Sequence, residues 1–275
     1  MYGTLYVVAT PIGNLDDITL RAIKILKEVD IIAAEDTRHT LKLLNHLEIS
    51  KPLISYYKQT EKVKTDILIE KLKRGLNVAL VSDAGTPVIS DPGEEVVKVA
   101  IKNDIKVVPI PGPCALITAL IASGMNAKEF SFIGFLPVNK REKEEKLKEV
   151  AEDTKTLIFY EAPHKLKSTL IEMHSVLGDR NICLARELTK IHEEFTINTI
   201  TNLLEFLQEP KGEYVLIVEG NNLSKKEKET IKLNEMTIKE HYEYYEKMGY
   251  EKKEIIKKIA KHRNVNKNEI YKLFI

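Results

Sequence analysis

The chain has 275 residues, of which 43% are hydrophobic and 30% charged, a composition typical of a globular protein with about two domains. No apolar run approaches the roughly 18 residues of a membrane span, and the first residues lack the pattern of a secretory signal peptide, so we expect a cytoplasmic protein that does not enter a membrane. The net charge of +1 is uneven, because residues 221–275 carry 14 Lys and Arg against nine Glu. This basic end indicates either a polyanionic partner or a solvated helix surface.

The first 115 residues alternate predicted strands and helices. Apolar runs predict strands at 5–9, 30–34, 52–56, 78–81 and 105–110. Apolar residues at helical spacing predict helices at 19–29, 40–47, 63–72 and 94–101. This alternation is typical of βα crossovers and a mostly parallel sheet, so the predicted fold class is α/β, with a first domain at 1–115.

A second block of elements follows. Strands are predicted at 130–134, 156–160, 181–185, 193–197 and 214–218, and helices at 141–152, 164–177 and 199–207. No helix separates the strands on either side of residues 185–193, which predicts a mixed sheet in a second α/β domain at 116–222. The polar residues 225–232 predict a linker, and 236–275 a small basic helical domain with two or three short helices.

Four unusual loops follow predicted strands, at residues 10–14 (TPIGN), 35–39 (EDTRH), 82–93 and 111–115 (PGPCA). Each alone could be an ordinary turn, but ligands of parallel sheets bind beyond the carboxyl ends of the strands. Glycine allows a ligand to approach the backbone closely. The chain has neither a P-loop nor a G-x-G-x-x-G sequence. A nucleotide-like ligand would therefore be held without a phosphate cradle, as S-adenosylmethionine can be.

Cysteine chemistry is not expected to contribute. The two cysteines, Cys114 and Cys183, form no C-x-x-C motif, so we expect neither a metal site nor a disulfide. No neighbouring residue in the sequence would serve as a base for a Cys114 nucleophile, so we interpret Cys114 as a small residue at a close packing contact.

The segments ATPIGNLDDITLRA, AAEDTRHT, VSDAGTPVISDPG, VPIPGPCALITAL, FIGFLP, IFYEAPHKL and LARELTKIHEEF occur in this order within residues 4–220. They resemble the tetrapyrrole-methylase family and, within it, the branch that methylates small-subunit ribosomal RNA. The single glycine of TPIGN is the usual form in that branch.

The resemblance implies two α/β domains of the tetrapyrrole methylase fold, a cofactor cleft between them and a C-terminal helical appendage. It also implies a homodimer, S-adenosylmethionine as cofactor, and transfer to a cytidine 2′-hydroxyl in the decoding region of 16S ribosomal RNA, as bare RNA or in the assembled 30S subunit. The alternatives are methylation of a small tetrapyrrole or corrin precursor, and a binding module without activity.

The expected cofactor contacts come mainly from the loops. They are Pro11, Ile12, Asp83, Ala84, Gly85, Thr86, Cys114, Ala115, Tyr160 and Ala185. Gly85 would bring bare backbone against the cofactor, while Pro87 and Pro92 stiffen the loop. Asp83 either accepts a hydrogen bond from the methionine ammonium or caps the turn, and Asp91 is predicted to be the N-cap of the helix after Pro92.

The reaction implied by the resemblance needs alignment of the hydroxyl with the methyl group, and a base helps because the hydroxyl is a poor nucleophile. The candidate catalytic residues are Glu161, Asp36 and His164. Asp36 could instead form a local ion pair with Arg38, and His164 could instead cap a helix or lie in the core.

The expected RNA contacts are Glu35, Arg38, Arg186, Lys190, Lys258 and Arg263. Arg186 and Lys190 could instead belong to a salt-bridged hairpin with Glu187. The end of the chain resembles a helix-turn-helix with Asn266 as an N-cap, which favours RNA docking, with packing in a dimer as the alternative.

Overall fold

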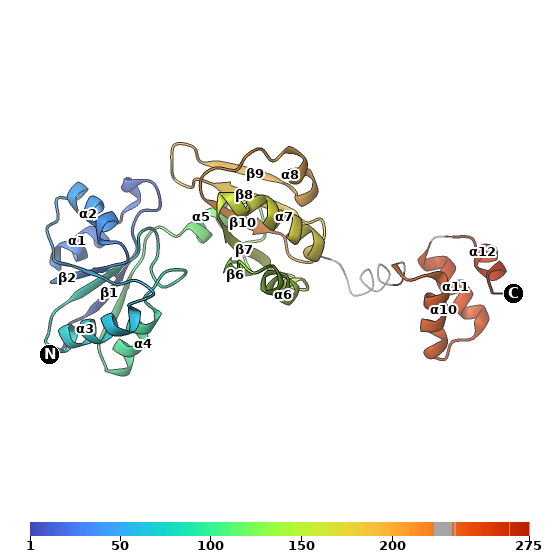
Figure 1. Ribbon diagram of the computed structural model, residues 1–275, viewed down its shortest axis with the longest axis horizontal. Helices are drawn as coiled ribbons and strands as arrows, with labels where there is room; N and C mark the ends of the chain where they lie inside the picture. The colour runs from blue at the N-terminus through green and yellow to red at the C-terminus, as the bar shows by residue number, and fades with distance from the viewer. Residues whose placement is uncertain (223–232, 234, 264, 275) are drawn as a thin grey trace. The chain divides into compact units, whose positions relative to one another are not determined.

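The computed structural model describes residues 1–222, 233, 235–263 and 265–274. The chain divides into two compact units, Met1–Gly220 and Asn221–Ile275. The described residues of the first unit form two five-stranded sheets (Figure 1). The linker predicted at 225–232 lies outside the described residues.

The first sheet is parallel throughout, with the order β3-β2-β4-β1-β5. Its strands are β1 (Leu5–Val8), β2 (Ile31–Ala34), β3 (Leu53–Ser55), β4 (Val78–Val81) and β5 (Val107–Ile110). Its helices are η1 (a 3₁₀ turn, Leu15–Asp17), α1 (Leu20–Glu28), α2 (Thr37–His46), α3 (Glu61–Lys73) and α4 (Glu94–Lys102).

Helices cover both faces of this sheet. Leu26 of α1 and Leu44 of α2 share one buried cluster with β2 and β4, whereas Leu68 of α3 and Val96 of α4 share another with the opposite face (Figure 1). The central strands β2 and β4 are buried at every residue, and so on both faces, which explains their unbroken apolar runs. The predicted parallel α/β arrangement is confirmed.

The second sheet is mixed, with the order β6-β7-β10-β8-β9; β6 and β7 are parallel and the other neighbours antiparallel. Its strands are β6 (Phe130–Phe135), β7 (Thr156–Glu161), β8 (Asn181–Arg186), β9 (Glu194–Thr199) and β10 (Tyr214–Val218). Its helices are α5 (Ala115–Ala122), α6 (Lys140–Val150), α7 (Pro163–Leu177) and α8 (Ile200–Phe206). The predicted mixed sheet is therefore confirmed.

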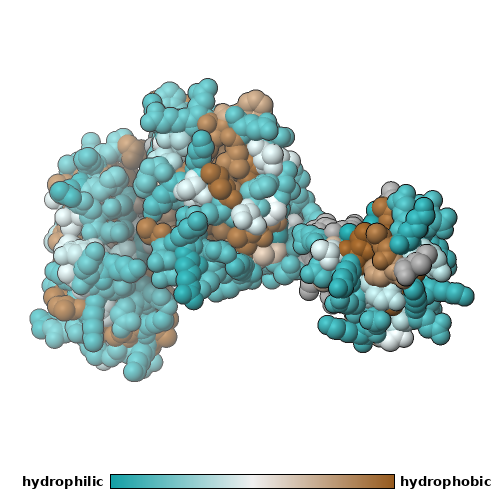
Figure 2. All heavy atoms as spheres, turned by 45° about the vertical axis from the view of Figure 1, so that its right-hand side comes forward, coloured by the Kyte–Doolittle hydropathy of each residue, from teal (hydrophilic) through white to brown (hydrophobic). Residues whose placement is uncertain are grey.

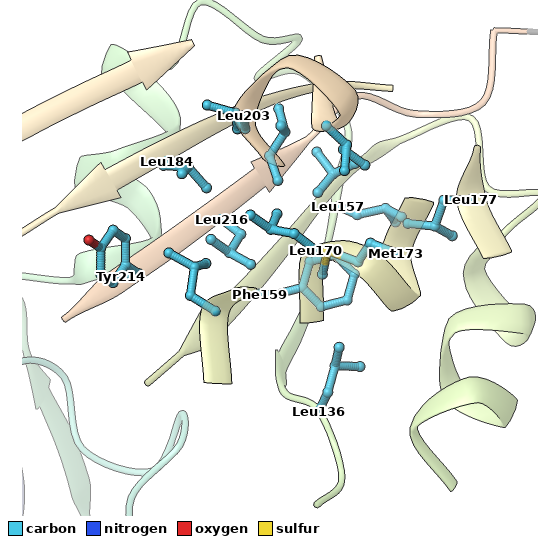
Figure 3. Close-up of a cluster of buried hydrophobic side chains, with 14 of the residues drawn as sticks. Leu136, Leu157, Phe159, Leu170, Met173, Leu177, Leu184, Leu203, Tyr214 and Leu216 are labelled. Carbon is cyan, nitrogen blue, oxygen red and sulfur yellow. The ribbon is translucent and has the colours of Figure 1, made fainter. Parts of the chain in front are cut away.

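The main core of this second part lies between one face of the sheet and helices α6, α7 and α8. Figure 3 shows Leu170 and Met173 of α7 and Leu203 of α8 packed over Phe159 and Leu216 of the sheet. Helix α5 covers the opposite face, where its Leu116 and Leu120 contact a second cluster.

The sequence analysis did not predict helix α5. Its sequence, ALITALIA, is apolar at almost every position, so no 3.6-residue pattern distinguishes it from a strand. The helix buries Leu116, Ala119 and Leu120 but leaves Ile121 74% exposed. The loop before it, PGPCA, thus leads from β5 of the first sheet to a helix that packs on the second sheet.

The second unit has its own small core. Helices α10 (Ile238–Lys247), α11 (Lys252–His262) and α12 (Lys267–Lys272) enclose buried side chains that include Tyr245, Ile255, Ile259 and Ile270. Asn266 is the N-cap of α12, as predicted, and its side chain accepts a hydrogen bond from the backbone N–H of Asn268 at 2.9 Å. Most of the visible surface of the molecule is hydrophilic (Figure 2).

Candidate active site

A cavity of 510 Å³ lies within the first unit and is lined by residues at the ends of strands of both sheets and in the loops beside them. This volume is in the range of small-molecule and cofactor sites. One wall comprises Ile12, Ala84, Gly85, Thr86, Ile89, Ser90, Asp91, Cys114 and Ala115, and the other comprises Phe135, Tyr160, Glu161, Ala162, Pro163, His164, Leu188, Glu213, Tyr214 and Val215. The opening expected at the carboxyl edge of the first sheet is therefore present.

The first wall is built from three of the four predicted loops, those at 10–14, 82–93 and 111–115. The loop at 35–39 is tied to this wall without lining it, because the backbone N–H of Asp36 donates to Oδ1 of Asp83 at 2.9 Å. Neither Asp83 nor Pro11 is among the lining residues. Asp83 thus joins two loops, and its expected contact with the cofactor stays a prediction.

Gly85 lines the cavity, and its expected contact with the cofactor stays a prediction. Its N–H and C=O are both paired with the backbone of Thr10, at 3.0 and 2.9 Å, so they are already engaged. Its φ of 79° is one that non-glycine residues rarely adopt, and a Cβ there would lie 3.1 Å from Cγ2 of Ile12. Glycine is needed here for the turn and for the space beside Ile12.

The second half of the same loop bends sharply at Val88, whose φ of 78° is unusual for a β-branched residue. The Val88 side chain packs into the core cluster of β4 and α4, which holds the loop in this conformation. The residues that follow, Ile89, Ser90 and Asp91, line the cavity.

The N-cap prediction for Asp91 is wrong. Helix α4 begins after Gly93, whose N–H donates to Oε1 of Glu61 on α3 at 2.9 Å. A carboxylate from a neighbouring helix thus supplies the acceptor that an Asp91 cap would have supplied. The half-buried Asp91 side chain contributes to the cavity wall instead.

Carboxylates gather around Asp91. Burial raises the pKa of Asp91, a hydrogen bond from Ser82 opposes this, and the charge of Asp83 adds to the increase. Burial also raises the pKa of Glu35, and the charges of Asp91 and Asp83 contribute further. This edge of the first sheet is therefore a negatively charged region beside an otherwise largely apolar cavity.

Glu161 lies on the second wall, is 6% exposed and has both carboxylate oxygens engaged. Oε2 accepts from the Thr169 hydroxyl at 2.6 Å, and Oε1 accepts from the N–H of Ala162 at 2.8 Å. Nζ of Lys143 lies 3.5 Å from the same hydroxyl and 3.2 Å from Oε2 of Glu172. These contacts connect the end of β7 to α6 and α7, and they favour a positioning role for Glu161.

Tyr160 and His164 also line the second wall. The Tyr160 hydroxyl accepts from the N–H of Leu116 at 3.2 Å, its ring packs edge-on against Phe132 and Phe135, and burial raises its pKa to about 12. His164 is exposed in the first turn of α7, whose N-cap is Ala162. Ala185 is buried beneath α5 and is not a lining residue.

The model of the family described as Tetrapyrrole (Corrin/Porphyrin) Methylases matches residues 4–204. The chain belongs to this family.

Relatives of this tetrapyrrole methylase cover almost all of its length. It is 50% identical over 274 residues to the Ribosomal RNA small subunit methyltransferase I of Halalkalibacterium halodurans, covering 99% of this chain and 94% of the relative. It is also 50% identical to the protein of the same name from Bacillus subtilis, covering 98% of this chain and 93% of the relative.

Solved structures share the fold. A Thermus thermophilus uroporphyrin-III C-methyl transferase complexed with S-adenyl homocysteine has a TM-score of 0.57 at 18% identity, covering 79% of this chain and 97% of the other. Diphthine synthase has a TM-score of 0.63 at 15% identity, covering 82% of this chain and 94% of the other. The predicted tetrapyrrole methylase fold is thus confirmed.

The cationic residues expected to bind RNA on the first unit of the methylase have acidic partners. Arg38 is highly exposed, and its guanidinium lies 2.7 Å from Asp36, whose pKa it holds well below its usual range. Arg186 lies 3.1 Å from Glu194, and Lys190 contacts both Glu187 and Glu213, at 3.0 and 2.7 Å. The local pairs considered as alternatives are present, and RNA contacts of these residues stay a prediction.

The two expected RNA contacts on the second unit differ in their surroundings. Nζ of Lys258 lies 4.4 Å from the centre of the Tyr250 ring, in a cation–π contact. The Arg263 guanidinium donates to the backbone carbonyls of Leu233 and Met236 and to Nδ1 of His241. Arg263 thus links α11 to the start of the unit, while neighbouring lysines stay on its surface.

Part of the cavity wall was not predictable from the sequence. Glu213 and Tyr214 line it because β10 runs antiparallel to β7, which places the start of β10 beside the end of β7, with Tyr214 opposite Glu161. The apolar run at 214–218 predicts a strand but does not show whether that strand runs parallel or antiparallel to its neighbours. Phe135 carried a detectable signal, as an aromatic residue directly after a predicted strand, in the segment FIGFLP.

Among the residues that the structure describes, no helix is long and apolar enough to cross a membrane. Within the same described ranges, no group of His, Cys, Asp and Glu side chains is arranged to hold a metal ion.

Proposed function

We propose that this tetrapyrrole methylase transfers a methyl group from S-adenosylmethionine to the 2′-hydroxyl of a cytidine ribose in the decoding region of 16S ribosomal RNA. The observation that carries the proposal is the 50% identity, over 99% of the chain, with a relative named for methylation of small-subunit ribosomal RNA. The likeness to enzymes that act on tetrapyrroles is below 20% in identity and supports the fold alone.

The cavity fits the proposed cofactor in size and chemistry. Its volume of 510 Å³ suits a nucleoside-sized ligand. Ala84, Gly85 and Ala115 have a small side chain or none, which leaves space in the cavity for such a ligand. Ile12 and Tyr160 offer apolar surface for a purine ring. When bound, S-adenosylmethionine supplies a methyl group on a positively charged sulfur, and the nearby carboxylates of Asp83 and Asp91 favour a cationic ligand.

The protein contributes to the reaction mainly by positioning the cofactor and the ribose. The loops from the first sheet would hold the cofactor together with Tyr160, and the second wall, with His164, would hold the ribose in line with the methyl group. Glu161 fixes the start of α7 and thereby the position of His164. Arg38, Arg186, Lys190 and the lysines of the second unit would bind phosphates of the RNA.

We further propose that the substrate is the assembled 30S subunit or its RNA, that the protein acts as a homodimer, and that it works in the cytoplasm. The net charge of the second unit, with 14 Lys and Arg against nine Glu, supports a polyanionic partner. The division at Gly220 supports the proposal that 236–275 form a domain separate from the two α/β domains at 1–115 and 116–222.

The test uses small subunits and bare 16S RNA from cells that lack this methylation. With tritiated S-adenosylmethionine, the protein should transfer label to one of these substrates, and nucleoside analysis should detect 2′-O-methylcytidine. A uroporphyrinogen-type tetrapyrrole is the comparison substrate. Label in the tetrapyrrole and none in RNA would favour the small-molecule alternative, and no affinity for the cofactor in calorimetry would favour a binding module without activity.

A further inference from the structure

We infer that Asp91 accepts the proton of the ribose 2′-hydroxyl during methyl transfer, an assignment that rests on the proposed function. The three acidic residues among the described lining residues of the cavity are Asp91, Glu161 and Glu213. They differ in how far their carboxylates are already engaged.

Two of these carboxylates have other partners. Both oxygens of Glu161 accept hydrogen bonds, from Thr169 and from the N–H of Ala162. Glu213 lies 2.7 Å from Nζ of Lys190, and its side chain is 81% exposed to solvent. Neither carboxylate is suited to take a proton from a buried hydroxyl.

Asp91 has different surroundings, although its carboxylate accepts a hydrogen bond from Ser82. It is half-buried, it lines the cavity, and in the part of the chain that the structure describes it belongs to no ion pair. Its carboxylate does not cap α4, because Gly93 is the N-cap and the N–H of Gly93 donates to Glu61. The strained Val88 and the core contacts of its side chain hold the loop so that Asp91 faces the cavity.

The charges around Asp91 suit a base. Asp83 on its own loop and Glu35 at the end of β2 are both acidic, and burial together with the Asp83 charge raises the pKa of Asp91. A carboxylate whose pKa is closer to neutral accepts a proton better in the transition state. From the second wall, Tyr160 faces it as a phenol whose own pKa is about 12, and His164 lines the same cavity as the competing base.

The step balances in atoms and charge. The hydroxyl oxygen forms a bond to the methyl carbon, and the carbon–sulfur bond breaks with its electron pair going to sulfur. The hydroxyl proton passes to the Asp91 carboxylate, which becomes neutral as the donor loses its positive charge. One positive and one negative charge therefore disappear together, which a partly desolvated cavity favours.

The test compares Asp91→Asn with Asp104→Asn, which makes the same chemical change at an exposed position with φ 56°, a conformation that asparagine accepts. Three quantities are measured: single-turnover transfer to small-subunit RNA as a function of pH, affinity for S-adenosylmethionine by calorimetry, and thermal unfolding. Removing a general base lowers a rate by about 100-fold or more. We expect that loss for Asp91→Asn, with a much smaller loss of cofactor affinity caused by the removed charge, and no change for Asp104→Asn.

The pH profile identifies the group. Asp91 must be ionised to accept the proton, so wild-type transfer should fall as the pH decreases through a value above the ordinary aspartate pKa of about 3.9. This acid limb should be absent from the residual activity of Asp91→Asn. Asp91→Glu keeps a carboxylate and should regain part of the rate together with the acid limb, which gives a second variant if Asp91→Asn does not fold.

Other outcomes overturn the assignment. A parallel loss of cofactor affinity and rate in Asp91→Asn would make Asp91 a cofactor ligand. Full activity of Asp91→Asn, with the loss and the pH change appearing in His164→Gln instead, would assign the proton to His164. If wild-type protein forms no 2′-O-methylcytidine, the proposed function fails and the assignment with it, whereas an active wild type beside an active Asp91→Asn refutes the assignment alone.

Discussion

Gly85→Ala tests the packing of the first cavity wall. At the φ of 79°, any residue with a Cβ incurs the left-handed backbone cost of about 1–2 kcal/mol. The new Cβ would also lie 3.1 Å from Cγ2 of Ile12, closer than ordinary contact, so Ile12 must move by a few tenths of an ångström. Overpacking of this kind costs roughly 1–3 kcal/mol.

Gly124→Ala is the matched control. Gly124 has a φ of 72°, and nothing lies within 4 Å of the position of its Cβ, so this variant has the backbone cost without the contact. The difference between the two variants in the free energy of unfolding should therefore be about 1–3 kcal/mol. A domain of this size shifts its melting temperature by about 2–4 °C per kcal/mol, and its total stability of about 5–15 kcal/mol keeps both variants folded.

The assays are denaturant unfolding and calorimetric titration with S-adenosylmethionine. Gly85→Ala should weaken cofactor binding by about tenfold, a change of 1.4 kcal/mol, because the added methyl group displaces Ile12 in the cavity wall. The larger Gly85→Val should abolish binding in a folded chain, and Gly124→Ala should bind as the wild type does. Equal stability of Gly85→Ala and Gly124→Ala, or wild-type cofactor affinity in Gly85→Val, would refute the reasoning.

Removal of residues 236–275 should weaken RNA binding while leaving cofactor affinity unchanged, measured by filter binding and calorimetry; equal RNA affinity would assign this unit a packing role. Burial, together with the charge of Arg263, lowers the pKa of His241 to about 4, so the unfolded chain binds the proton more readily. The stability of the second unit should therefore decrease as the pH falls from 6.5 to 4, and His241→Phe should remove that dependence in thermal melts; an unchanged slope would contradict it. Burial raises the pKa of Cys183 to about 11, so iodoacetamide at pH 8 should modify Cys114 in the cavity and spare Cys183. Bound cofactor should slow the modification of Cys114, and peptide mass spectrometry would measure both effects. Equal labelling of the two cysteines would refute this prediction.

The strands of both sheets were predictable because their signal is local. Runs such as residues 78–81 are apolar without alternation, which is the pattern of a strand buried on both faces. Helix α5 was not predictable in this way, since ALITALIA has no polar face and is apolar both where it packs on the second sheet and where Ile121 is exposed. Only its packing against the second sheet identifies this segment as a helix.

The candidate site was predictable by region more than by residue. Ile12, Ala84, Thr86 and Cys114 were expected from their loops and line the cavity. Asp83, from the same loop as Ala84, accepts a hydrogen bond from Asp36 of a neighbouring loop and is not among the lining residues. The difference depends on the direction of each side chain, which a loop sequence leaves open.

The sequence by itself determined that strands and helices alternate over the first 115 residues, and that glycine- and proline-rich loops follow several of the strands. These features depend on hydrophobic spacing and on turn chemistry, which act over a few neighbouring residues. Only the tertiary structure decided which carboxylates line the cavity and how each of them is engaged. Glu61 caps α4 in place of Asp91, Thr169 binds Glu161, and antiparallel β10 brings in Glu213, and each of these contacts joins different elements of the fold.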